Sequence, residues 1–389
     1  MRLTLQKNIA LAVYIVSFCT FIFPTGLIAE GNYTIPKMIF VGTIGILYLL
    51  MKISSKKISR FEAVFICLIT ALTIITRNIN YLLFITLCYL EEIAKYKKDI
   101  VDCLNNSKVL YICLAFTILY TFCFIGSNDS RGRYAFTAIK EINQSGLAIF
   151  CLGIMLLNKN KKVGYFTLVF GCLTFSRSYY LALLCLIIYN FGKKYFSIKE
   201  KTIKLFNYIN LTLVSSILLI LLGFFYINQY KSGNIILGGN NSTRLVNFLD
   251  YSNFFRFQAT IVLLRIFLSY PKDVIFGISN EKYVELGHKI SSKMKLPFRD
   301  TPPHNLFFSH LKIYGLFTFI EVYYVSRILK NIVSVRNAGI YIGIVLYSIF
   351  LGAGLYSYWL YLSLFCLVYY DDYCNNNDDN KKIQGYMKD

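Results

Sequence analysis

A few arginine, histidine and asparagine side chains at the ends of apolar runs are the residues of this 389-residue chain best suited to chemistry. Arg177 stands in a short polar interruption, 174–178, between two apolar runs. A charge there costs free energy unless it is paired or faces water. A guanidinium stays charged and gives paired hydrogen bonds to phosphate oxygens. The sequence therefore predicts phosphate binding at Arg177, with equal weight on the alternative that it anchors the chain to lipid headgroups.

His304 and Asn305 follow two prolines at the head of another apolar run. A histidine with a pKa near working pH can orient or deprotonate a hydroxyl group. Asn305 equally fits a helix N-cap, which is the structural alternative. His310 lies near the opposite helical face, which argues against a metal shared with His304. The nearby carboxylates, each a candidate proton acceptor or a solvated loop charge, are Asp273, Glu281, Glu285 and Asp300.

Motifs that would hold a metal or a cofactor are missing from the sequence. It contains no Asp-x-Asp pair, no Cys/His spacing for a metal, no Walker loop and no Gly-rich dinucleotide turn. Most of the 11 cysteines lie inside apolar runs, where cysteine behaves as a small hydrophobic residue. We therefore expect neither a metal nor a cofactor.

The composition is that of a membrane protein. A soluble domain carries about 25% charged residues, whereas this chain has 16% charged and 56% hydrophobic residues. Apolar runs of spanning or near-spanning length lie at 10–29, 36–51, 61–76, 79–94, 109–125, 145–158, 163–176, 179–192, 205–228, 306–326, 338–354 and 356–370. The predicted fold is an all-α polytopic membrane protein with about 12 transmembrane helices.

The placement of positive charge predicts the orientation. With both termini in the cytoplasm, the short cytoplasmic loops hold about four times as many lysines and arginines as the short outer loops. These basic residues form short clusters between apolar runs, not one stripe interleaved with aromatic residues, so the net charge of +21 does not indicate nucleic acid. Residues 1–370 are expected to form one transmembrane domain, and 371–389 a polar, disordered cytoplasmic tail.

The segment 229–305 is expected to be a long loop on the outer face, inserted in the transmembrane domain. Residues 254–267 are too charged to span a membrane and too apolar for water. Helical spacing places Gln258, Val262, Arg265 and Ser269 on one stripe. This pattern predicts an amphipathic helix that lies at the membrane surface or packs on the bundle. Arg256, nine positions before Arg265, is nearly opposite it on a straight helix.

Residues 127–326 resemble the O-antigen polymerase/ligase family of bacterial envelope glycosyltransferases. Arg131 and Arg133 precede Asn143-Gln144-Ser145-Gly146 at a helix head, and Leu173-Thr174-Phe175-Ser176-Arg177-Ser178 joins two helices. Arg256 then comes ahead of Pro271-Lys272-Asp273-Val274-Ile275-Phe276-Gly277. Finally, His304-Asn305-Leu306-Phe307-Phe308-Ser309-His310-Leu311 runs into Tyr314-Gly315-Leu316-Phe317. The order and topology of these four features carry the resemblance. Ser279 stands where the family pattern usually has a second glycine.

The resemblance implies a metal-independent glycosyltransferase on the periplasmic face of the bacterial inner membrane. Its substrate would be an undecaprenyl-diphosphate-linked oligosaccharide, and it would join repeat units into O-antigen or a similar surface polysaccharide. Arg177 and Arg256 would bind the diphosphate, with Arg133 and Arg265 as second candidates. His304 would orient or deprotonate the acceptor hydroxyl, and Asn305 would assist in substrate binding.

Two alternatives and two further partners remain open. An O-antigen ligase shares the architecture but transfers the glycan to lipid A-core. A flippase or transporter of lipid-linked oligosaccharides belongs to another class, but no internal repeat is visible and the informative residues crowd on the outer side, which favours an enzyme. Membrane lipid is an expected partner, and a chain-length regulator protein is a candidate one.

Overall fold

The computed structural model describes residues 46, 49–50, 52, 58, 60–76, 78–85, 87–88, 102, 108–123, 142–195, 207–235, 249, 251–300, 303, 305–330, 332–349, 366–367 and 370. Every regular element in these ranges is helical, so the all-α class is confirmed for the part of the chain that the structure describes. The elements are α3 (Arg60–Thr76), η2 (Ile79–Phe84), α6 (Val109–Cys123), α7 (Ile142–Lys159), α8 (Lys161–Gly171), η5 (Cys172–Thr174), α9 (Arg177–Tyr195), α11 (Tyr208–Lys231), α12 (Tyr251–Ser269), α13 (Pro271–Phe276), α14 (Asn280–Lys293), α15 (Leu306–Tyr314), η7 (Gly315–Phe317), α16 (Thr318–Lys330) and α17 (Ala338–Ile349).

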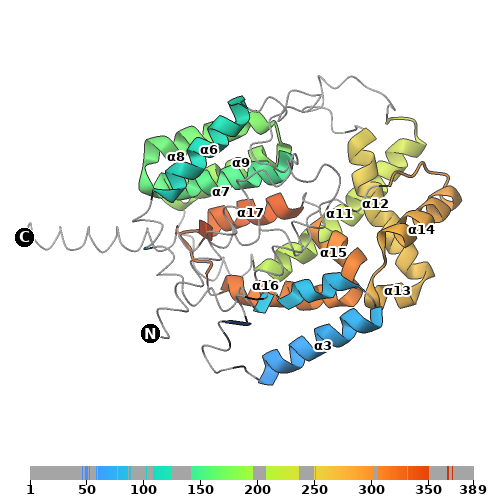
Figure 1. Ribbon diagram of the computed structural model, residues 1–389. Coiled ribbons are helices and arrows are strands. Elements are labelled where there is room, and N and C mark those ends of the chain that lie inside the picture. The colour runs from blue at the N-terminus through green and yellow to red at the C-terminus, as the bar shows by residue number, and fades with distance from the viewer. Residues whose placement is uncertain are drawn as a thin grey trace, which may run out of the picture.

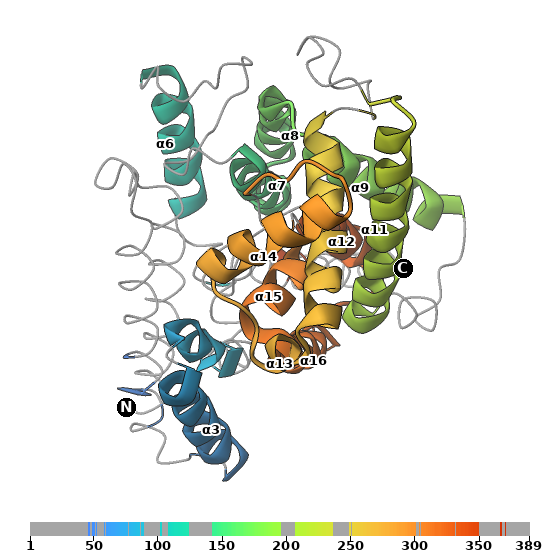
Figure 2. The same ribbon diagram turned by 90° about the vertical axis from the view of Figure 1, so that its right-hand side faces the viewer.

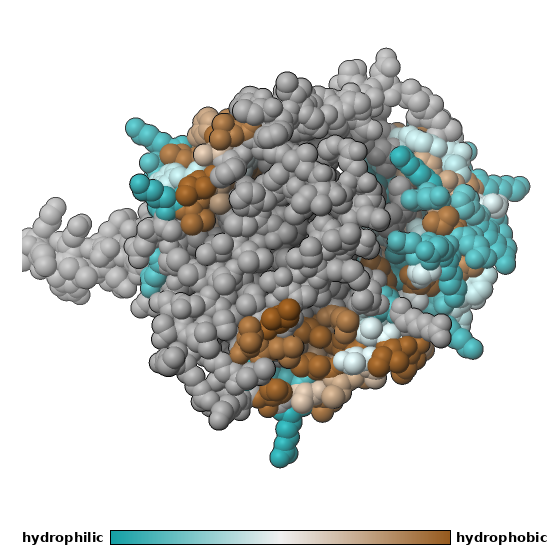
Figure 3. Space-filling model, viewed as in Figure 1, coloured by the Kyte–Doolittle hydropathy of each residue, from teal (hydrophilic) through white to brown (hydrophobic). Residues whose placement is uncertain are grey.

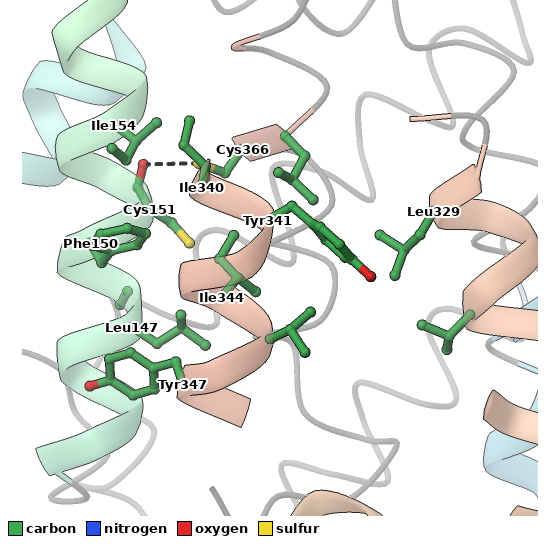
Figure 4. Packing of buried hydrophobic residues seen from close by; sticks show 14 of the residues in the cluster. Leu147, Phe150, Cys151, Ile154, Leu329, Ile340, Tyr341, Ile344, Tyr347 and Cys366 are labelled. Atoms are coloured by element: carbon green, nitrogen blue, oxygen red, sulfur yellow. Dashed lines mark hydrogen bonds between the residues drawn. The ribbon is translucent and has the colours of Figure 1, made fainter. Parts of the chain in front are cut away.

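Helices α7, α8, α9 and α17 pack as one group (Figure 1). Asn160 alone separates α7 from α8, and its side chain caps α8 by accepting the N–H groups of Lys162 and Val163. Figure 4 shows α7 facing α17 through Leu147, Phe150 and Ile154 on one side and Ile340, Ile344 and Tyr347 on the other. Cys366 joins this core and donates its thiol to the Cys151 carbonyl at 3.7 Å. Because α9 packs on both α17 and α7, this apolar core also holds α9 in place.

Helices α11 and α12 form a second, antiparallel pair, with α14 on α12 (Figure 2). The rings of Tyr230 and Phe254 stack with centroids 4.7 Å apart, and those of Tyr226 and Phe257 stack at 4.9 Å. Further along the pair, Gly223 lies directly against Ile261. In these contacting pairs the residue number on α11 decreases as the residue number on α12 increases, so the two helices are antiparallel.

The helix expected around 254–267 exists, but it is not amphipathic. Gln258 and Val262 from the predicted polar stripe are buried, and so are Phe254 and Phe255 around it. The Gln258 amide donates to the Pro297 carbonyl at 2.6 Å, which satisfies this polar group inside the protein. Both sides are covered because α11 packs on one and α14 on another. Of the two predicted placements, packing on the bundle is confirmed. The predicted polar face was wrong for Gln258 and Val262, which are buried, whereas Arg265 and Ser269 near the end of α12 are exposed.

The apolar run 306–326 was predicted to form one helix. In the structure it forms two, α15 and α16, separated by the short helix η7. Gly315 ends α15 with a left-handed φ of 57°, and a Cβ atom there would lie 2.3 Å from the Val274 carbonyl oxygen. Gly277, with φ of 76°, approaches the Ile313 carbonyl in the same way. A side chain at either position would collide with backbone, so glycine permits the turn and the close approach together. We call this junction of α13, η7 and the end of α15 the glycine corner.

Large apolar side chains cover the outside of several helices. Ile74 and Ile75 on α3 are 71% and 73% exposed, and Figure 3 shows brown surface over α3 and hydrophilic surface over α14. Among the described residues, α11 is the one helix long and apolar enough to cross a membrane. The runs 10–29 and 356–370 lie wholly or largely outside the described residues, as does the tail 371–389.

Candidate functional site

The corner between α8 and α9 is held by hydroxyl groups. Tyr179, fully buried, donates to the Leu168 carbonyl at 2.7 Å, and Tyr180 donates to the Cys172 carbonyl at 2.9 Å. Gly171 leaves room for the Tyr179 hydroxyl, since a Cβ atom there would lie 2.2 Å from that oxygen. Phe175 turns the chain with a left-handed φ of 44°. Two hydrogen bonds and one strained residue therefore fix where α9 begins.

Arg177 is the first residue of α9 and is half-buried between buried Ser176 and buried Ser178. The first turn of α9 contains no acidic side chain. The N-terminus of a helix carries partial positive charge, so the helix and the guanidinium both favour an anion at this corner. Phosphate binding at Arg177 stays a prediction, and the start of α9 is compatible with it.

Arg256 and Arg265 both lie on α12, on opposite sides as their spacing predicts. Arg256 is half-buried and Arg265 is exposed. Their helix packs on α11 and α14, whereas the helix of Arg177 packs on α17 and α7. The candidate arginines are thus distributed over two packing groups.

Asn305 is the N-cap of α15. It is 3% exposed, and its side-chain oxygen accepts the N–H of Phe308 at 3.0 Å. The capping alternative is therefore confirmed for Asn305, while its part in substrate binding stays a prediction. His304 and Arg133 lie outside the described residues.

A buried pair that the sequence did not indicate lies where α15 meets α16. His310 Nδ1 and Glu321 Oε2 are 2.5 Å apart, and both side chains are almost fully buried. The edge of the His310 ring meets the Tyr314 ring with centroids 5.7 Å apart. The turn at Gly315 allows these two residues, eleven positions apart, to meet, and the spacing of the histidines does not indicate this contact.

A second polar cluster lies beside the glycine corner. Lys312 is buried, its Nζ is 2.5 Å from Asn280 Oδ1, and the ammonium lies 5.1 Å from the centre of the Tyr283 ring. Burial raises the pKa of the Tyr283 hydroxyl, so this ring stays neutral and interacts with Lys312 as a π-system. Asp273 binds Lys282 through Oδ1 at 2.7 Å. Asp273 was expected to be either a proton acceptor or a solvated loop charge, and it is neither exposed nor unpaired, while Lys312 lies in the apolar run 306–326.

The other predicted carboxylates lie at the surface. Asp300 is 3.2 Å from His288, and both side chains are more than half exposed. Glu281 and Glu285 lie on the exposed face of α14. Among the described residues, the histidine, cysteine, aspartate and glutamate side chains form no group of three that could hold a metal ion.

The candidate site therefore consists of an arginine corner on α9, two arginines on α12 and a lysine cluster beside the glycine corner. Comparison with protein-family models, with curated proteins and with solved structures finds no match to this chain.

Proposed function

We propose that this chain is a polytopic inner-membrane glycosyltransferase that joins undecaprenyl-diphosphate-linked oligosaccharide repeat units on the periplasmic face. The proposed arrangement has twelve spans with both termini cytoplasmic. The asymmetry of positive charge between short loops supports it. The apolar outer faces of α3, α9 and α11 support it as well, because soluble proteins rarely expose so many large apolar side chains together.

The position of Arg177 at the start of α9 is the single observation that supports the proposed glycosyl transfer. In the proposed reaction, an acceptor hydroxyl attacks the anomeric carbon of the donor, and the bond from that carbon to the diphosphate oxygen breaks. Negative charge accumulates on the departing diphosphate, and a fixed guanidinium stabilises it without needing to reorganise. The hydrogen bonds of Tyr179 and Tyr180 hold the start of α9, which suits this role. The acceptor hydroxyl loses its proton to a base, for which His304 is the candidate.

A strain that lacks the gene tests the proposal. Loss of a polymerase leaves lipid A-core carrying a single repeat unit, because ligation still occurs. Bare core would instead indicate the ligase. Unchanged surface polysaccharide would contradict both readings. Accumulation of lipid-linked oligosaccharide on the cytoplasmic face would indicate a flippase.

A further inference from the structure

The ammonium of Lys312 is buried, and no carboxylate of the part of the chain that the structure describes pairs with it. Lys312 is 3% exposed, and buried lysines are usually paired with a carboxylate. Within the described residues, Lys312 makes no ion pair; its contacts there are the neutral Asn280 amide oxygen and the Tyr283 ring. An ammonium has three N–H donors, so an anion would complete its coordination.

The start of helix α14 lies beside Lys312. Asn280, its hydrogen-bond partner, is the first residue of α14 and is exposed, so the ammonium lies just beneath the surface. The positive end of the α14 dipole points to the same place. The neighbouring charged groups are Lys272, Asp273, Glu281 and Lys282. The two lysines balance the two carboxylates, and Lys282 pairs with Asp273 at 2.7 Å, so the charge of Lys312 itself stays uncompensated among these residues.

An exposed apolar surface borders this cluster. Its residues come from the end of α12, from α13, from η7 and from α16, elements that meet at the glycine corner. They are Leu268 (79% exposed), Ile275 (44%), Phe276 (41%), Leu316 (47%) and Phe319 (55%). Cationic and apolar surfaces side by side complement an amphiphile with an anionic head.

We propose that the glycine corner binds the diphosphate of an isoprenoid-linked oligosaccharide, with Lys312 and Asn280 at the diphosphate and the apolar side chains along the lipid chain. The assignment to an isoprenoid diphosphate, and not to a phospholipid, rests on the proposed function. A polymerase must hold two lipid diphosphates, one on the donor and one on the acceptor. Arg177 lies in the other packing group, so the lysine cluster supplies a second site for the acceptor.

Lipid binding to the purified full-length chain in detergent tests this inference. The probes are undecaprenyl diphosphate, phosphatidylglycerol and inorganic pyrophosphate, each titrated against wild type, Lys312→Met and the control Lys289→Met on the exposed face of α14. We expect Lys312→Met to weaken binding of undecaprenyl diphosphate by about ten- to a hundredfold, while Lys289→Met binds as wild type. Asn280→Ala, at an exposed position, should weaken it by about threefold even if Lys312→Met fails to fold.

The outcomes separate the site from the proposed function. Equal affinity of wild type, Asn280→Ala and every folded lysine variant for undecaprenyl diphosphate would overturn the inference, even if the wild type polymerises. Equal affinity of the wild type for phosphatidylglycerol would overturn the assignment to an isoprenoid diphosphate. Tight binding of pyrophosphate alone, lost in Lys312→Met, would show an anion site without a lipid and also overturn it. Selective loss of undecaprenyl diphosphate binding in a protein that does not polymerise would uphold the site and reject the proposed function.

Discussion

Helices α11 and α14 each bury one face, yet their exposed faces have opposite chemistry. The exposed large side chains of α11 include Leu213, Val214, Ile217, Leu218, Leu221, Phe224 and Phe225. Those of α14 are Glu281, Lys282, Glu285, His288, Lys289 and Lys293. Helix α12 packs on both of them. The described parts of 229–305 therefore form helices packed beside α11, and one of these helices, α14, has a charged exposed face.

The glycine corner connects α12, which packs on both α11 and α14, to α15 and α16. Breaking it should have the largest effect. Gly315→Ala places a Cβ atom against the Val274 carbonyl oxygen at a left-handed φ. We expect a loss of more than about 3 kcal/mol of stability, since steric overlap and backbone strain add. Thermal unfolding in detergent measures it.

Gly233→Ala is the matched control for this substitution. Gly233 has a φ of 75°, but nothing lies within 4 Å of its missing Cβ. Only the strain remains there, about 1–2 kcal/mol. Equal destabilisation by the two substitutions would show that the contact between α13 and η7 contributes nothing.

A lysine placed on each exposed face tests whether α11 and α14 face different surroundings. Leu221→Lys alters the middle of α11, where the side chain is 61% exposed. If this face contacts lipid, the substitution costs about 2.5–3.5 kcal/mol in membrane insertion. Ser292→Lys on exposed α14 should change stability by less than about 0.5 kcal/mol. The yield of folded protein in membranes reports both, and near-normal yield of Leu221→Lys would place the α11 face in water.

Helix α15 lies between the two regions, and the smallest expected effect concerns its cap. Asn305→Ala removes the acceptor for the Phe308 N–H and should cost about 1 kcal/mol. Asn305→Ser keeps an acceptor and should restore both thermal stability and polymerisation. A serine variant that is stable yet polymerises more than about tenfold slower would instead place Asn305 at the substrate.

Long apolar runs were sufficient to predict many of the helices. The runs 61–76, 145–158, 179–192 and 205–228 each became a helix within a few residues of its expected ends, as α3, α7, α9 and α11. A run of this kind has no competing structure, since its backbone groups must be satisfied within the segment wherever water is excluded.

What the sequence missed depends on contacts between distant segments. Nothing in the apolar stretch around Gly315 indicates a turn until α13 is placed against it. The pairing of His310 with Glu321 follows from that turn. Likewise, the sequence of α12 alone does not show that α11 and α14 cover it and bury its polar residue Gln258. Of the site residues, Arg177 and Asn305 lie at helix starts, which local turn and capping interactions determine. The lysine cluster, in contrast, forms through contacts between segments that are distant in the sequence.

Polymerisation by the purified chain tests whether Arg177 stabilises a departing diphosphate. Wild type, Arg177→Lys and Arg177→Ala would each receive a lipid-linked repeat unit in excess EDTA, with product length followed over time. We expect a ladder of products from the wild type without metal. Arg177→Lys keeps the charge but loses the paired hydrogen bonds, so it should be about ten- to a hundredfold slower, and Arg177→Ala slower still. A wild type that makes no ladder, or an Arg177→Lys variant that polymerises at the wild-type rate, would contradict diphosphate chemistry at the start of α9.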